Sequence, residues 1–161
     1  MAKNLFGNKV RKILRMPIYI DSSFLLSLLL EQKIKEEEII IWKNHTTRLS
    51  SFLLEIECLV ALRRIYGDNF ESLPKKWLKT KENELKEFIN EISVKKIDNS
   101  ILEIIEFKME LSECRTLDAI HVGTALLFAE HSSEPIYMCS YDKRVRDISS
   151  NLNMFLLPES I

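Results

Sequence analysis

The sequence predicts an α/β fold in which helices cover both faces of a central, mainly parallel sheet. Short runs of β-branched and aromatic residues, such as Ile18–Ile20 and Ile136–Cys139, alternate along the chain with longer helical segments. This alternation is typical of parallel strands joined by crossover helices. Only three glycines occur in 161 residues, so we expect short loops, and no glycine-rich phosphate-binding loop is present.

The elements can be assigned in chain order. After Ile18–Ile20, Ser22 or Ser23 can cap a helix over Phe24–Glu31. The segment Ile39–Trp42 is compatible with a helix or a strand, and its pattern does not decide between them. The later expected elements are a helix from Ser50 to Tyr66 that stops at Gly67, a helix over Trp77–Ile92, a strand over Ser93–Ile97, a helix capped by Asn99 or Ser100 that ends at Leu111, the strand Ile136–Cys139, a short basic helix after Asp142 and a last strand over Met154–Leu157.

The segment after Arg115 predicts the most deeply buried helix of the chain. Thr116 has the character of its N-cap, and Asp118 lies in the first turn. Apolar and small side chains surround nearly the whole helix axis, which is typical of a helix inside the core. An acid in a first turn can simply complement the helix dipole. At the start of a buried helix, however, Asp118 is also a candidate functional residue.

Composition limits the classes of function. The chain has 23 basic and 24 acidic side chains, so contact with nucleic acid would need a local basic patch. Its three cysteines show no CxxC spacing, which favours buried thiols in a reducing compartment. The apolar run from residue 18 to residue 30 contains an aspartate and is too short to cross a bilayer. We therefore expect a cytoplasmic protein, with a basic arm over residues 1–16 and one domain over residues 17–161.

Four acids are expected to meet at one edge of the sheet. Asp21 and Asp142 follow predicted strands, and ligands of such sheets bind at the carboxyl ends of strands. Asp118 can point to the same edge. The helix after Ser50 offers Glu55 or Glu57, and periodicity alone does not choose between them. Because clustered carboxylates repel one another, a hard divalent cation such as Mg²⁺ or Mn²⁺ would stabilise them. This chemistry suits phosphodiester hydrolysis by an activated water.

Four segments of the chain resemble the acidic motifs of PIN-domain nucleases, and most of all those of the VapC-type toxin ribonucleases. In order, they are IYIDSSFLL, SSFLLEIECLVALRR, RTLDAIHVGTALLF and SYDKRVRDISS. The resemblance extends over about residues 17–158. It implies a three-layer α/β/α fold, dependence on Mg²⁺ or Mn²⁺, and endonucleolytic cleavage of RNA.

The resemblance also implies roles for individual residues. It selects Glu57 over Glu55, so the expected catalytic and metal-binding acids are Asp21, Glu57, Asp118 and Asp142. Ser23 and Ser140 match hydroxyl positions of the motifs and would support these acids. Ser140 stands where the family usually has threonine, and Gly123 stands where it usually has alanine.

Other polar residues near these motifs have simpler explanations. Lys143, Arg144 and Arg146 can contact RNA phosphates or can be ordinary surface charges. Asp147 is expected to pair with a neighbouring base on the surface, and it is the substitute if Asp142 is not in the site. We expect His121 to be a packed, hydrogen-bonded core residue.

The leading hypothesis is therefore a metal-dependent endoribonuclease that acts as the toxin of a type II toxin–antitoxin pair. The expected partners are an RNA substrate, a cognate antitoxin and a second copy of the chain. Apolar surface around Phe24–Leu30 and on the helix after Ser50 is expected to receive a protein partner. The alternative is a catalytically silent scaffold that binds RNA or protein, although the presence of all four acids favours the enzyme. A phosphatase that uses Asp21 as nucleophile is a weaker hypothesis, because no second aspartate follows two residues later.

Overall fold

The computed structural model describes residues 16–30 and 36–160. Within these ranges, a sheet of five strands forms the centre of the molecule, in the order β3-β2-β1-β4-β5, and every pair of neighbours is parallel. The predicted α/β fold with a parallel sheet is therefore confirmed. The strands are β1 (Ile18–Ile20), β2 (Arg48–Ser51), β3 (Ser93–Lys95), β4 (Tyr137–Cys139) and β5 (Phe155–Leu157).

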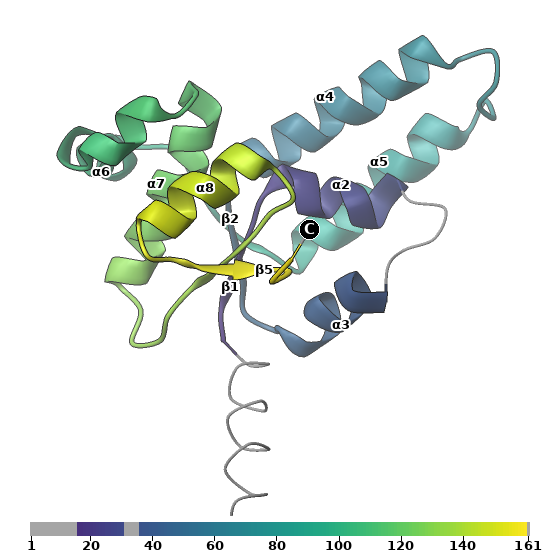
Figure 1. Cartoon of the computed structure of the whole chain (residues 1–161). Coiled ribbons are helices and arrows are strands. Elements are labelled where there is room, and N and C mark those ends of the chain that lie inside the picture. The colour runs from purple at the N-terminus through teal and green to yellow at the C-terminus, as the bar shows by residue number, and fades with distance from the viewer. Residues whose placement is uncertain (1–15, 31–35, 161) are drawn as a thin grey trace, which may run out of the picture.

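Helices cover both faces of the sheet (Figure 1). On one face lie α2, α3, α4 and α5, with α4 and α5 running side by side as a long pair. On the other face lie α6, α7 and α8. Their bounds are α2 (Ser22–Leu30), α3 (Glu36–Asn44), α4 (Leu53–Asp68), α5 (Trp77–Asn90), α6 (Asn99–Phe107), α7 (Thr116–Glu130) and α8 (Lys143–Asn151), with a 3₁₀ helix, η1, over Met109–Glu113.

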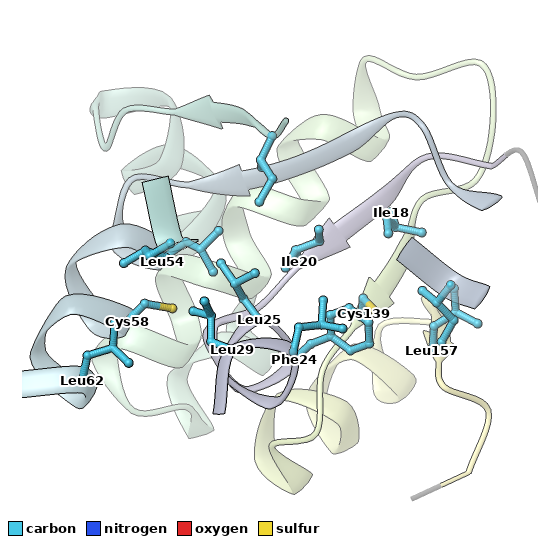
Figure 2. Packing of buried hydrophobic residues seen from close by; sticks show 14 residues of the cluster. Ile18, Ile20, Phe24, Leu25, Leu29, Leu54, Cys58, Leu62, Cys139 and Leu157 are labelled. Carbon is cyan, nitrogen blue, oxygen red and sulfur yellow. The ribbon is translucent and has the colours of Figure 1, made fainter. Parts of the chain in front are cut away.

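Strand β1 connects the two hydrophobic cores. Ile18 and Ile20 point to the face covered by α2 and α4, where they pack with residues such as Phe24 and Leu54 (Figure 2). Tyr19 points the opposite way, into the core that α7 and α8 complete. This alternation is the two-residue period of a strand. Because all three β1 residues are fully buried, β1 places whatever follows it at the centre of the molecule.

The main difference from the sequence prediction is strand β2. Ser50 and Ser51, which we expected to begin a helix, belong to β2, and α4 begins at Leu53. The Ser50 hydroxyl donates to the carbonyl of Ile20 at 2.6 Å, and the Ser51 hydroxyl accepts from the Leu53 amide at 3.1 Å. Pairing with β1 and β3 on its two sides thus stabilises a strand that has little apolar signal of its own.

Helix ends also differ in detail. The ambiguous segment Ile39–Trp42 is part of helix α3. Thr116 is the first residue of α7 and not its cap; Arg115 occupies the cap position without a side-chain hydrogen bond. Asp98, and not the two residues after it, caps α6 by accepting from the Ser100 amide at 3.1 Å.

Other boundaries shift by a few residues. Helix α6 ends at Phe107, and η1 follows from Met109. Helix α4 continues through Gly67 to Asp68. The expected basic arm, residues 1–16, lies outside the described residues apart from Met16, as does Glu31. No helix in the described ranges combines the length and the apolar character needed to cross a membrane.

Candidate active site

The candidate site lies at the point where the order in which strands are added to the sheet reverses. From β1 the chain proceeds outward through β2 and β3, and it then returns to the other side of β1 as β4. Asp21 directly follows β1 and its amide donates to the carbonyl of Cys139, the last residue of β4, at 3.0 Å. Asp21 therefore lies at the carboxyl edge of the sheet, between the central strand β1 and its neighbour β4, which is where ligands bind in parallel sheets.

One carboxylate oxygen of Asp21 is fixed by two serines. The hydroxyls of Ser23 and Ser140 donate to Asp21 Oδ2 at 2.6 and 2.8 Å. With their protons used in this way, the serine oxygens accept from the backbone: Ser23 Oγ from the amide of Tyr141 at 2.9 Å, and Ser140 Oγ from that of Asp142 at 3.0 Å. The serines thus hold Asp21 and the loop after β4 together, and Asp21 Oδ1 takes no part in this network.

The carboxylate of Glu57, on α4, lies near that of Asp21. Its Oε2 lies 2.8 Å from His121 Nε2, and that nitrogen lies 3.8 Å from Asp21 Oδ1. Ligand atoms of Asp21, Glu57 and His121 all lie within 4.8 Å of one another. The structure thus brings Glu57, and not Glu55, to the edge where Asp21 lies.

His121 is buried and hydrogen-bonded, as expected, but it also links the core to the site. Only 1% of it is exposed, and its Nδ1 lies 3.0 Å from the hydroxyl of Tyr19. Burial lowers the pKa of His121, but the hydrogen bond with Glu57 and the nearby acids outweigh burial, so the pKa is raised. For Glu57, burial raises the pKa, but the hydrogen bond and charge of His121 outweigh it and the pKa is lowered. The sequence offered one sign that His121 could lie near the acids: it follows Asp118 by three residues on a helix, and residues at this spacing lie on the same face.

Asp118 lies in the first turn of α7, close to the other acids. Its Oδ2 is buried and has no hydrogen-bond partner among the described residues. Burial raises the pKa of Asp118, and the negative charges of Asp142 and Asp21 raise it further. Asp118 is therefore an acid whose ionised form the protein alone does not stabilise fully.

Asp142 begins α8. Its Oδ1 accepts from the amide of Arg144 at 2.8 Å, which caps the helix. It is half-buried, and its charge acts on Asp118. Asp142 thus adjoins the site through Asp118, although it is not among the three residues whose ligand atoms lie within 4.8 Å of one another.

These residues fit a hard divalent cation. Asp21, Glu57, Asp118 and Asp142 offer carboxylate oxygens, which Mg²⁺ and Mn²⁺ prefer. The buried, unpartnered Oδ2 of Asp118 is the clearest sign, because a buried carboxylate oxygen without a partner is costly unless a ligand satisfies it. The donor set therefore suits a cation held chiefly by oxygen, with His121 orienting Glu57.

The basic residues of α8 differ in their surroundings. Lys143 forms an ion pair with Asp147 at 2.6 Å, and both side chains are exposed, as expected for Asp147. Arg146 does not fit the expected role in phosphate binding. It is 7% exposed, and its guanidinium donates inward to carbonyls, among them those of Ser140 at 2.9 Å and Pro158 at 2.9 Å. Arg144 remains exposed at the start of the helix.

Comparison with known proteins supplies a family for this geometry. The model of the PIN domain matches residues 18–150, which include Asp21, Glu57, Asp118 and Asp142. PIN domains are typically metal-dependent nucleases. Comparison with individual curated proteins gave no significant match.

Proposed function

Because this chain belongs to the PIN-domain family, we propose that it is a Mg²⁺- or Mn²⁺-dependent endoribonuclease that hydrolyses RNA phosphodiester bonds. One observation carries the proposal. Asp21 and Glu57 meet at the carboxyl edge of the sheet, next to the buried and unpartnered Oδ2 of Asp118. This arrangement is costly for a protein without a cation and suited to one that binds it.

Each residue has a separate task in the proposed reaction. Asp21, Glu57, Asp118 and Asp142 would hold the cation. Two hydroxyl contacts hold Asp21 through Oδ2, so that Oδ1 stays directed at the site. The hydrogen bond with His121 fixes the carboxylate of Glu57 and helps to keep it ionised. When bound, Mg²⁺ or Mn²⁺ would activate a water molecule and offset charge on the phosphodiester.

Cleavage of a mixed RNA pool with added Mn²⁺ tests this proposal. The Asp118→Asn variant keeps the shape of the side chain but removes its charge, so it should abolish cleavage, as should excess chelator. Glu55→Gln is the matched control on α4 and should cleave like the wild-type protein. Robust cleavage by Asp118→Asn, or by the wild-type protein in chelator, would refute the metal-carboxylate mechanism. A lack of any cleavage by the wild-type protein would favour the silent scaffold.

We also propose that the enzyme is the toxin of a type II toxin–antitoxin pair, with an antitoxin and a second copy of the chain as partners. The apolar residues expected on α2 do not support this, since Phe24, Leu25, Leu28 and Leu29 are buried. Helix α4 does support it. Phe52, at the N-cap position of α4, and Ile56 and Val60 on the helix recur every four residues, and each is more than 40% exposed. Growth arrest on expression, relieved by a small protein from the neighbouring reading frame, is the expected result. Normal growth with active enzyme would contradict the toxin role.

A further inference from the structure

A pocket beside the acids is lined by two arginines that stand at the starts of two different helices. It has a volume of about 380 Å³ and includes Asp118, Arg115 and Arg144 in its lining. Arg115 stands at the start of α7, and Arg144 stands in the first turn of α8. The volume lies within the range of small-ligand pockets, roughly 300–1,000 Å³.

The guanidinium groups of the two arginines are not engaged by other described residues of the protein. Among the described residues, neither guanidinium forms an ion pair or a hydrogen bond. On α8, by contrast, Lys143 forms an ion pair and Arg146 donates hydrogen bonds to carbonyls. Each arginine also lies at the positive end of a helix dipole, where a cation is disfavoured. The charge that both act on is that of Asp118. Proteins violate such local electrostatic rules at functional sites.

We propose that Arg115 and Arg144 form a phosphate-binding subsite, which holds an RNA phosphodiester next to the one that is cut. This inference rests on the proposed function, because it takes the acids beside the pocket to be the place of cleavage. Guanidinium groups suit the task, since each presents a planar fork of donors that matches two phosphate oxygens. The subsite also explains how a chain with almost no net charge can bind RNA: two unpaired cations converge beside the acids.

Acidic residues around the pocket do not prevent anion binding. Asp147 is paired with the positive charge of Lys143. Asp118 also lines the pocket, and the proposed cation, which it would share with Asp21, would offset its charge. Glu113 is the remaining acid of the lining, and it is exposed. Its charge should oppose a phosphate in this pocket. Removal of that charge should therefore strengthen RNA binding, which is the opposite of the effect expected when an arginine is removed.

Binding of a fluorescein-labelled single-stranded RNA, measured by anisotropy in chelator over a series of salt concentrations, tests the subsite without catalysis. Arg115→Gln and Arg144→Gln should each weaken binding about tenfold and should each lower the salt dependence, with the slope of log K against log salt falling by about 0.7. Lysine at either position should restore the slope more than the affinity, because it keeps the charge and loses the fork. Glu113→Gln should tighten binding.

Matched variants separate the pocket from general electrostatics. Arg64→Gln removes an exposed arginine of α4, and Glu110→Gln removes an exposed acid of η1; neither residue lines the pocket. Both should bind RNA like the wild-type protein. The proposal is overturned if Arg115→Gln and Arg144→Gln bind within twofold of wild type, or if Arg64→Gln weakens binding as much. Thermal melts identify any variant that is misfolded.

The outcome is distinguishable from failure of the proposed function. If the wild-type protein does not cleave with Mn²⁺ but binds RNA through the two arginines, the nuclease proposal fails and the subsite stands. If it cleaves with Mn²⁺ but the arginine variants bind and cleave normally, the nuclease proposal stands and the subsite is refuted.

Discussion

Tyr19, His121 and Glu57 form a hydrogen-bonded chain from the core to the site. Tyr19 lies in the middle of β1, and burial holds the pKa of its hydroxyl far above the ordinary value. It therefore stays neutral and fixes the His121 ring through Nδ1, so that Nε2 faces Glu57 and Asp21. A strand residue thus sets the geometry of an acid on α4 through one histidine.

Removing the Tyr19 hydroxyl tests this chain. Tyr19→Phe leaves the buried Nδ1 of His121 without a partner, so the free energy of unfolding should fall by about 1–2 kcal/mol. Urea denaturation of the metal-free protein measures it. Tyr137→Phe is the control: its ring stacks on Phe155 at 5.0 Å, and its hydroxyl has no hydrogen-bond partner among the described residues. The control should change stability by less than about 0.5 kcal/mol. Equal stability of the two variants would mean that the Tyr19–His121 bond contributes nothing.

At the scale of elements, sequence predicts best what short-range pattern determines. Strands β1 and β4 were predicted because apolar residues fill them, and α7 because apolar residues surround its axis. Strand β2 is not predicted, because Arg48–Ser51 has the sequence RLSS, which carries no strand pattern. Its conformation depends on pairing with β1 and β3 on its two sides. Likewise, charge pattern on α8 does not reveal that the Arg146 guanidinium turns inward to backbone carbonyls.

The candidate site shows the same division. Asp21 could be placed from the sequence because it ends a strand, and Asp118 because it begins a buried helix. The choice of Glu57 depended on alignment with the family motif, since helical periodicity alone did not decide between Glu55 and Glu57. The contact between Glu57 and His121 joins residues 64 positions apart, so no local pattern could predict it.

Helix α7 offers a test of packing against α6. A Cβ at Gly123 would lie 3.4 Å from Ile105 Cγ1 and 3.8 Å from Ile101 Cγ2, which is ordinary van der Waals contact. Since glycine in a helix interior costs about 0.5–1 kcal/mol relative to alanine, Gly123→Ala should raise the free energy of unfolding by about that amount.

A second glycine separates helix propensity from packing. Gly67 lies in the last turn of α4, and an alanine Cβ there would have no packing neighbour within 4 Å among the described residues. Gly67→Ala therefore reports propensity alone. The difference between the two variants in urea denaturation gives the contribution of packing. A Gly123→Ala protein that is less stable than wild type would show that α6 cannot accommodate the methyl group.

At the scale of the whole molecule, charge is balanced overall but not locally. The formal net charge is −1, yet acids from α4, α7 and the ends of β1 and β4 converge at one edge of the sheet. Without a cation, folding must bring these acids together. Burial first, and then the charges of Asp142 and Asp21, raise the pKa of Asp118 above its ordinary value of 3.8. The folded state therefore opposes ionisation of this group, and stability is lost as the pH rises through the raised pKa.

Asp118→Asn should consequently melt at a higher temperature than the wild-type protein in chelator at neutral pH. Its advantage should shrink as the pH falls toward 3.8, because protonation then neutralises Asp118 in both the folded and the unfolded wild-type protein. Added Mn²⁺ should reverse the order: a ligand that binds only the folded state stabilises it, and the variant binds that ligand less well. Glu55→Gln should follow the wild-type protein throughout. A wild-type melting temperature that Mn²⁺ leaves unchanged, or an Asp118→Asn protein that is the less stable one in chelator, would mean that the acids do not form a repulsive cation site. The reversal with Mn²⁺ is the informative result, because loss of a purely structural carboxylate would lower the melting temperature under both conditions.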